Sequence, residues 1–305
     1  MKFGYCIRSP TTRTYPEIRD LTVKVEGLGF ESVHITDHLL GFDESQDQKE
    51  TFLEALTVLA ALAIETKKVK LGQIVLCNSF RNPVYLAKII STLDHLSNGR
   101  ALLWLGAGWY EEEYKAYGYP FGTPKRRVDE LEESITIYKK VFTEDETNFK
   151  GKFWRLERNR NYPKPIQKPY PQIVIGTTGK RMIDIACREA DGINLPYLVD
   201  EQRKIFRENI STINEKLKKY NRDPSKFEIS LFATASMVNS QEGLKKLMRK
   251  RNILNSNLKN LFIGTPDNIK EKITEVENLG IKKMVITVEG SEFEDPLEIF
   301  SRDIV

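Results

Sequence analysis

The segment IVIGTTGKR, residues 173–181, carries the strongest chemical signal in the sequence. A run of apolar, strand-forming residues ends there in a short turn, and a helical pattern starts directly after it. The turn consists of Gly176, Thr177, Thr178 and Gly179. Glycines allow backbone N–H groups to approach an anion, threonine hydroxyls add donors, and a helix N-terminus favours negative charge. We therefore predict a phosphate-binding turn; the alternative is an ordinary strand-to-helix connection without a ligand.

A second signal is the segment ITDH, in which Asp37 and His38 directly follow an apolar strand. An aspartate accepts a hydrogen bond from a ring N–H, and a histidine positions a substrate or relays a proton. The alternative is a helix cap or a loop pair without a catalytic role. We expect His34, within the strand, to be a core residue and His95, late in a helix, to be structural.

A third signal is LGAGWYEEEY, residues 105–114, which ends another apolar run. Gly106 and Gly108 permit the close approach of a flat ring, and the aromatic residues after them are suited to wall it. Glu111 is a candidate acid or hydrogen-bond acceptor. We expect the next two glutamates, Glu112 and Glu113, to be solvated in a first helical turn.

Other common site patterns are missing from the sequence. We find no Walker A segment, no HExxH, and no Ser-His-Asp or Cys-His set that can be assembled. The three cysteines lie far apart in apolar segments and lack metal-ligand spacing, so we expect them to be reduced and buried: Cys6, Cys77 and Cys187. No metal site is predicted.

Eight short runs rich in Val, Ile and Leu predict the strands that must position these residues. They are residues 3–7, 32–36, 69–76, 101–105, 172–176, 192–195, 228–235 and 283–288. Amphipathic helical patterns lie between them, near residues 18–28, 53–63, 83–93, 128–142, 180–189, 201–220 and 267–279.

Eight strand-then-helix units favour an α/β fold of the (β/α)8 TIM-barrel type over an open sheet. We predict a single domain over residues 1–305, with an insertion at about 110–171 between the fourth and fifth strands. The irregular part of this insertion, 143–171, is expected to pack over the barrel top. A second irregular region is expected at 240–261.

The charge balance of the chain excludes some classes of partner. The sequence has 47 basic and 43 acidic residues, interspersed along the chain, for a net charge of +4. This balance is too mild to indicate nucleic-acid binding, although it allows a local basic mouth. The chain starts with a strand-like segment, and its longest apolar run is too short to span a membrane. We therefore expect a cytoplasmic protein without a membrane partner.

Together these segments resemble the bacterial luciferase-like superfamily, and most closely its branch that uses the deazaflavin coenzyme F420. The matching stretches cover nearly the whole chain: MKFGYCI, LGFESVHITDH, VKLGQIVLCNSFRNP, LDHLSNGRALLWLGAGWYEEEYKAYGYPF, KPYPQIVIGTTGKR, ADGINLP and IGTPDNI. LSNGR followed by LGAGW is the most specific of them. The family fold is a (β/α)8 barrel with insertions, as the strand count predicts.

The resemblance implies hydride transfer between F420 and a small organic substrate bound over the cofactor ring. It implies that His38 and Glu111 are catalytic. It also implies a non-prolyl cis peptide at Ile74–Val75, against the ring. The implied cofactor-binding residues are Asp37, Ile74, Val75, Cys77, Gly106, Ala107, Gly108, Gly176, Thr177, Thr178 and Gly179. Charge alone suggests that Arg126, Lys164 and Lys180 attract the acidic tail of F420.

The sequence also departs from the family, and alternatives remain open. Cys77 and Asn78 stand where many members carry Thr and Pro. No second acidic residue pairs with Glu111, so the sequence does not support a sugar-phosphate dehydrogenase. One alternative is an FMN-dependent monooxygenase fed by a separate reductase, which needs a dry pocket. Others are a flavin- or deazaflavin-binding protein without turnover and a barrel enzyme that binds only a sugar phosphate.

Two predicted helices are apolar on more than one face, which suggests a partner surface. The residues concerned are Phe52, Leu53, Leu56 and Leu59 in one helix and Ile89, Ile90 and Leu93 in the next. We therefore predict a homodimer, which the family resemblance also implies.

Overall fold

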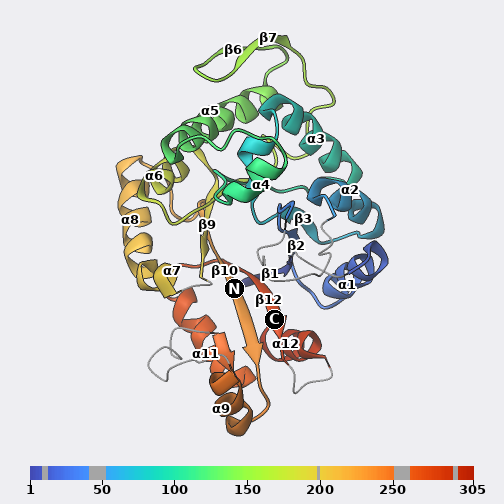
Figure 1. Ribbon diagram of the computed structural model, residues 1–305, viewed down its shortest axis with the longest axis vertical. Coiled ribbons are helices and arrows are strands. Elements are labelled where there is room, and N and C mark those ends of the chain that lie inside the picture. The colour runs from blue at the N-terminus through green and yellow to red at the C-terminus, as the bar shows by residue number, and fades with distance from the viewer. Residues whose placement is uncertain (9–12, 41–52, 198–199, 251–261, 291–294) are drawn as a thin grey trace.

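Strands and helices alternate along the chain and close into a barrel in the computed structural model (Figure 1). The structure describes residues 1–8, 13–40, 53–197, 200–250, 262–290 and 295–305. The barrel strands are β1 (Lys2–Ile7), β2 (Ser32–Ile35), β3 (Lys70–Gln73), β4 (Leu76–Cys77), β5 (Leu103–Gly106), β8 (Ile173–Gly176), β9 (Gly192–Pro196), β10 (Glu228–Met237) and β12 (Lys283–Glu289). The eight predicted strands are all present, with β3 and β4 as two parts of one of them.

The barrel strands are parallel and follow the order β3-β2-β1-β12-β10-β9-β8-β5-β4. A parallel bridge between Leu71 and Ala101 connects β3 with β5, so the sheet returns to its starting edge. The predicted (β/α)8 barrel is confirmed. Because all these strands run the same way, their carboxyl ends meet at one end of the barrel, where such folds place their sites.

Helices surround the barrel and follow the predicted pattern, except that the predicted helix at 201–220 is divided into two and the last helix, at 296–304, was not predicted. They are α1 (Tyr15–Gly27), α2 (Ala55–Glu65), α3 (Pro83–Leu96), α5 (Pro124–Thr143), α6 (Lys180–Glu189), α7 (Asp200–Lys204), α8 (Phe206–Lys219), α11 (Pro266–Glu277) and α12 (Pro296–Ile304). Their starts have local causes: in α3, for example, Pro83 occupies the first turn and Asn82 Oδ1 accepts from Val84 N at 2.9 Å.

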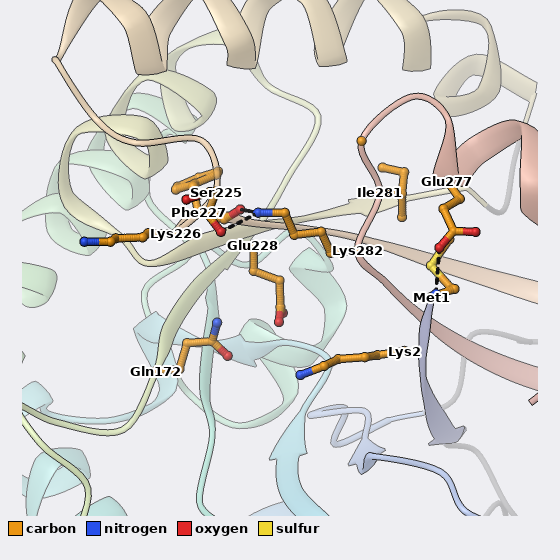
Figure 2. Close-up of a pocket in the computed structure, with 11 residues that line it drawn as sticks. Met1, Lys2, Gln172, Ser225, Lys226, Phe227, Glu228, Glu277, Ile281 and Lys282 are labelled. Atoms are coloured by element: carbon orange, nitrogen blue, oxygen red, sulfur yellow. Dashed lines mark hydrogen bonds and ion pairs between the residues drawn. The ribbon is translucent and has the colours of Figure 1, made fainter.

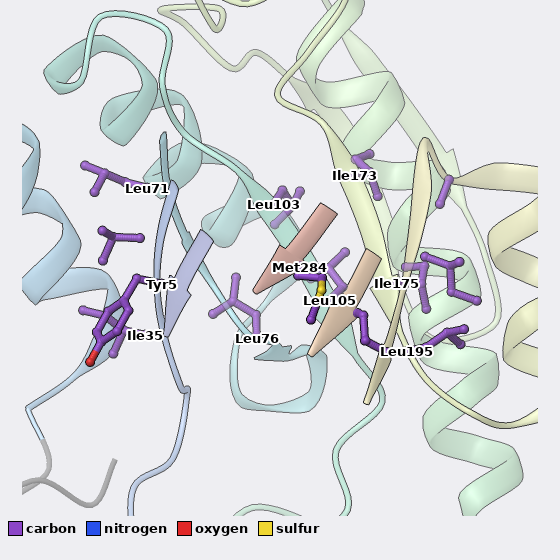
Figure 3. Close-up of a cluster of buried hydrophobic side chains, with 14 of the residues drawn as sticks. Tyr5, Ile35, Leu71, Leu76, Leu103, Leu105, Ile173, Ile175, Leu195 and Met284 are labelled. Atoms are coloured by element: carbon purple, nitrogen blue, oxygen red, sulfur yellow. The ribbon is translucent and has the colours of Figure 1, made fainter. Parts of the chain in front are cut away.

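Two layers of apolar side chains form the core. Alternate strand residues face outward and pack under the helices, as Leu71, Leu103, Leu105, Ile173 and Ile175 do in Figure 3. The intervening residues form a smaller cluster that includes Cys6, Trp104, Val174, Phe232 and Val285. Since residues of one strand alternate between the two faces of a sheet, this second cluster fills the barrel interior.

The predicted insertion contains a hairpin that lies on the outside of the barrel. Its strands are β6 (Thr147–Lys150) and β7 (Arg155–Asn159), which pair antiparallel. The chain after the hairpin contacts the outer helices: His95 Nε2 on α3 lies 2.8 Å from Lys164 O, and Lys164 Nζ donates to Val141 O on α5 at 2.9 Å. The expectation that residues 143–171 cover the barrel top is therefore wrong.

The hairpin strands, α12, and the helix and strand at 241–250 and 262–264 were not expected, whereas a first helical turn was expected at Glu112 and Glu113. Helix α4 (Glu111–Ala116) follows β5, and α9 (Gln241–Lys250) with β11 (Phe262–Gly264) occupies part of the region predicted to be irregular. β11 pairs in parallel with the end of β10. A 3-10 turn, η1 (Asn78–Phe80), follows β4. None of the described helices is both long and apolar enough to cross a membrane.

Candidate active site

His38 follows β2 at the carboxyl end of the barrel, and its buried partner is Glu113 on α4. The His38 Nδ1–H donates to Glu113 Oε1 at 3.1 Å, and the Glu113 side chain is 3% exposed. The same carboxylate accepts from Leu39 N at 2.7 Å and from Leu40 N at 3.1 Å. Because Nδ1 donates to a carboxylate, Nε2 is the nitrogen of His38 that can give or take a proton.

The prediction that Glu113 is solvated is wrong. Helix α4 starts at Glu111, so Glu113 and its buried neighbour Tyr114 turn inward while Glu112 stays exposed. Glu111, the predicted catalytic acid, pairs with Lys115 at 3.0 Å and is 46% exposed. The structure thus does not bring Glu111 to His38. In the sequence, the signal for a buried Glu113 was its neighbour Tyr114, an aromatic residue in the same short helix that also turns inward.

Asp37 lies beside His38 but points into the protein. Its Oδ2 accepts from Arg81 Nη1 at 2.7 Å and from Cys77 N at 2.9 Å, and its Oδ1 accepts from Arg81 Nη2 at 2.8 Å. The Asp37 side chain is 1% exposed. Burial lowers the pKa of Arg81, but the charges and hydrogen bonds of Asp37 and Glu54 outweigh it and raise that pKa above its ordinary value. Asp37 therefore ties β2 to the end of β4.

Val75 lies between β3 and β4, and the peptide bond between Ile74 and Val75 is cis, as the resemblance implies. The glycines of the two neighbouring strands make room for the Val75 side chain. A methyl group at Gly106 would lie 2.7 Å from Val75 Cγ2, and one at Gly176 would lie 2.7 Å from Val75 Cγ1. These two predicted cofactor residues thus shape the surface that Val75 presents at the barrel mouth.

Gly108 has φ +79, which favours glycine, and it makes room for a buried polar contact. The Tyr114 hydroxyl lies 3.1 Å from Cys77 Sγ, and a Cβ at Gly108 would overlap both groups. Burial raises the pKa of the Cys77 thiol to about 12. Cys77 is therefore a protonated packing residue rather than a nucleophile. Ala107, between the two glycines, accepts from the Tyr114 hydroxyl at 3.5 Å.

The predicted phosphate turn connects β8 with α6, as the sequence indicated. Gly179 is the N-cap of α6 and offers no side-chain cap, and the first turn of the helix carries no acidic residue. Thr177 Oγ1 accepts from Gly179 N at 2.9 Å, which folds the turn back on itself. By contrast, the turn in the segment IGTPDNI, which also leads from a strand into a helix, is already closed, because Thr265 and Asn268 cap α11 reciprocally. The start of α6 is therefore the better candidate for an anion site.

The three basic residues suggested for binding the acidic tail of F420 each contact other groups of the protein. Arg126 pairs with Glu130 at 2.8 Å, and Lys164 holds the hairpin segment against α5. Lys180, at the start of α6, is 82% exposed and lies 3.3 Å from Glu208. Of the three, Lys180 lies next to the phosphate turn.

Trp109 is 65% exposed and its ring meets that of His38 edge to face, with centroids 5.9 Å apart.

His34 and the three cysteines are buried, as the sequence predicts. His34 is fully buried, contacts Ser32 Oγ at 3.0 Å and has a pKa well below its ordinary value, chiefly because of burial. His34 is thus a core residue, as predicted. The three cysteines are free and buried, also as predicted. Within the described residues, no group of three or more His, Cys, Asp or Glu is placed to hold a metal ion.

A cavity of about 550 Å³ opens at the opposite, amino-terminal end of the strands (Figure 2). Lys2, Gln172 and Glu228, which line it, belong to or adjoin strand starts. Enzymes with parallel barrels of this type have their active sites at the carboxyl ends of the strands, whereas residues at the other end contribute to stability. We therefore place the candidate active site at the mouth that holds His38 and the start of α6, not in this cavity.

One mouth of this parallel barrel thus carries a histidine–carboxylate pair and a glycine turn without a side-chain cap, at the end where barrels of this type place their sites. The profile of the luciferase-like monooxygenase family matches residues 1–256, and the chain belongs to this family. The predicted resemblance is therefore confirmed.

Individual relatives point to two cofactors. An F420-dependent glucose-6-phosphate dehydrogenase from Amycolatopsis mediterranei is 27% identical over 95% of this chain and 93% of its own. An FMNH(2)-dependent dimethylsulfone monooxygenase from Pseudomonas putida is 32% identical over 45% of this chain and 38% of its own. The fold is similar to that of an F420-dependent secondary alcohol dehydrogenase, with a TM-score of 0.83, 19% identity, and coverage of 99% and 98% of the two chains.

Proposed function

We propose that this protein is an oxidoreductase that uses coenzyme F420 to exchange a hydride with a small organic substrate. The observation that carries the proposal is the His38–Glu113 pair, which lies at the same end of the barrel as the uncapped start of α6. Two relatives that align with nearly the whole chain are F420-dependent, which supports the choice of cofactor.

The residues at the barrel mouth fit F420. The free N–H groups in the first turn of α6 and the turn Gly176–Gly179 suit its phosphate. The surface formed by Val75 between Gly106 and Gly176 suits a flat ring, because no side chain from either glycine covers it. Lys180 adds a positive charge beside the phosphate turn. When bound, F420 supplies the ring carbon that gives or receives the hydride.

The chain's own residues supply positioning and proton transfer. Glu113 fixes the tautomer and orientation of His38, so Nε2 takes the hydroxyl proton when an alcohol is oxidised and returns it in the reverse direction. The Trp109 ring lies edge to face against the His38 ring. Asp37, through Cys77 N and Arg81, holds the chain after Val75 in place.

A turnover experiment tests this proposal. The purified protein is mixed with F420 and a panel of alcohols and glucose 6-phosphate, or with reduced F420 and enones, imines and aldehydes, and F420 absorbance is followed. We expect turnover with at least one class and a loss of about 10²-fold or more in His38→Ala. His95→Ala, on the outer face of α3, is the matched control and should keep full activity. Equal rates in both variants would contradict the role of His38.

The FMN-dependent monooxygenase is the second candidate, because the monooxygenase relative aligns with 45% of this chain. Consumption of oxygen with reduced FMN, together with no turnover of F420 on any substrate of the panel, would favour the monooxygenase. Tight binding of either cofactor without any turnover would favour the non-catalytic binding protein.

We also propose a homodimer, but on other residues than the sequence suggested. Leu56, Leu59, Ile90 and Leu93 are buried in the core, Leu53 and Ile89 pack against it, and Phe52 lies outside the described residues. The exposed apolar side chains of these helices are instead Ile64 on α2 and Tyr85 and Leu96 on α3. They support a partner surface along α2 and α3.

A further inference from the structure

Arg8 directly follows β1, and its side chain reaches across the inside of the barrel mouth. Its Nη2 donates to the Thr234 hydroxyl on β10 at 2.5 Å, and its guanidinium carbon lies 5.6 Å from the centre of the Phe232 ring. In the sheet, β12 lies between β1 and β10. Because Phe232 belongs to the interior cluster, Arg8 crosses β12 on the inner face of the barrel.

Within the part of the chain that the structure describes, the positive charge of Arg8 has no carboxylate partner. Among the described residues, its contacts are the Thr234 hydroxyl and the Phe232 ring. A guanidinium carries five N–H donors in a planar fork that matches a carboxylate or a phosphate, and one hydroxyl satisfies only one of them. Arg81, which also lies beside the site, is by contrast neutralised by Asp37 and Glu54. Among the described residues, Arg8 is therefore a cation at the mouth that keeps donors for a ligand.

The position of Arg8 separates it from the cofactor phosphate site. The phosphate turn follows β8, which lies four places from β1 in the sheet order, on the other side of the barrel. His38 follows β2, the immediate neighbour of β1. Arg8 thus stands on the side of the mouth where His38 exchanges a proton with the substrate.

We propose that Arg8 binds an oxyanion group, carboxylate or phosphate, of the substrate. The substrate class is then a small molecule with an anionic group in addition to the carbon that exchanges the hydride. This inference rests on the proposed function, since it assigns the substrate to the His38 side of the mouth. Trp109, which is 65% exposed, offers an aromatic surface for the uncharged part of such a molecule.

Calorimetric titration of the F420-loaded protein with three matched probes tests the inference. Benzoate and phenyl phosphate carry the two oxyanions, and benzamide is the neutral analogue of benzoate. We expect at least one oxyanion to bind about tenfold or more tightly than benzamide, as for a hydrogen bond to a charged group. The stronger of the two oxyanions identifies the group that the substrate carries.

Variants assign the preference to Arg8. Arg8→Gln should bind all three probes equally weakly, while Arg8→Lys should keep part of the preference, because it retains the charge but not the fork. Arg19→Gln, on the exposed face of α1, makes the same charge change away from the mouth and should behave like the unmodified protein. A preference that is missing in the unmodified protein, or that survives in Arg8→Gln, would overturn the inference.

Two further measurements distinguish a misfolded variant and a failure of F420 binding from a failure of the proposal for Arg8. Thermal unfolding of Arg8→Gln shows whether the variant folds, and Arg8→Lys provides a second, more conservative test if it does not. F420 affinity is measured separately in each protein. If the unmodified protein does not bind F420, the proposed function fails, whatever the probes show. If Arg8→Gln binds F420 weakly but binds the deazaflavin chromophore without its phosphate tail normally, Arg8 holds the cofactor tail and the inference is wrong.

Discussion

At the scale of single residues, the carboxylate of Glu113 gives His38 one orientation. It is buried and accepts from two backbone N–H groups as well as from the ring, so its position does not depend on His38. A histidine held in this way keeps its proton on Nδ1 and leaves Nε2 for chemistry. Glu113 is therefore a positioning residue.

We expect Glu113→Gln to lower kcat by about 10- to 100-fold, as is usual for a residue that orients a functional histidine. Cofactor affinity should stay within about twofold, because Glu113 does not face the phosphate turn. Steady-state kinetics together with a fluorescence titration measure both quantities. Glu112→Gln, one residue away and exposed, is the matched control and should leave kcat unchanged.

The double variant His38→Asn/Glu113→Gln distinguishes positioning from general destabilisation. If Glu113 acts through His38, the double variant should be no slower than His38→Asn alone. Rate losses that multiply would show that Glu113 acts by another route.

At the scale of elements, Asp37 and Arg81 connect β2 with the chain that follows β4. We expect Asp37→Asn to lower the free energy of unfolding by about 3 kcal/mol, because it weakens a buried ion pair and leaves Arg81 partly uncompensated. Glu130→Gln, in the exposed pair with Arg126, should cost less than about 1 kcal/mol. Urea denaturation measures both. A stable Asp37→Asn with weakened cofactor binding would instead support the direct cofactor contact predicted from the sequence.

The fit between Val75 and its two glycines gives a second prediction at this scale. Gly106→Ala should destabilise the fold by about 1–3 kcal/mol through overpacking against Val75. Adding Val75→Ala should recover most of this loss, since it removes the atoms that the new methyl group meets. Gly179→Ala is the control, because a methyl there meets nothing closer than 3.5 Å. Thermal unfolding compares the variants, and no recovery in the double variant would contradict the packing account.

Glu31 ties together the amino-terminal ends of four strands. It contacts Lys2 at 2.8 Å, Lys70 at 3.3 Å and Lys283 at 3.2 Å. Burial opposes its ionisation, yet these lysines outweigh burial and lower the pKa of Glu31 to about 2 from an ordinary value of 4.5. Since the folded-state pKa is the lower one, the stabilisation is present above pH 4.5 and is lost as the pH falls towards 2.

We therefore expect the free energy of unfolding to fall by on the order of 2 kcal/mol more in the unmodified protein than in Glu31→Gln between pH 5 and pH 2. Urea denaturation across this range gives the comparison, with the exposed Glu112→Gln as the control. Parallel curves for the unmodified protein and Glu31→Gln would contradict the assignment.

The sequence was sufficient for the barrel strands because their apolar runs and intervening helical periods are local patterns. It also placed the glycine- and threonine-rich turn between β8 and α6, because the residues of that turn are contiguous. The partners of Asp37 and His38 were missed because Arg81 and Glu113 lie 44 and 75 residues further along the chain. Such pairs are set by barrel closure, which a local pattern does not encode. The outer position of the hairpin was missed for the same reason.

At the scale of the whole molecule, the exposed apolar side chains of α2 and α3 predict self-association. Tyr85 is 65% exposed and Ile64 is 58% exposed. We expect light scattering at micromolar concentration to give the mass of a dimer, and Tyr85→Glu to shift it towards the monomer by placing a charge in the interface. Lys152→Glu, on the outer hairpin, is the control. A monomer for the unmodified protein would contradict the prediction.

The most direct test of the central claim is a titration of the purified protein with F420 and, separately, with FMN, followed by cofactor fluorescence. The account predicts tight binding of F420 and weak or no binding of FMN. It also predicts that the phosphate turn carries much of the affinity, so that Thr177→Ala and Thr178→Ala each weaken F420 binding. Tight binding of FMN alone would contradict the account and assign the protein to the monooxygenase chemistry of its family.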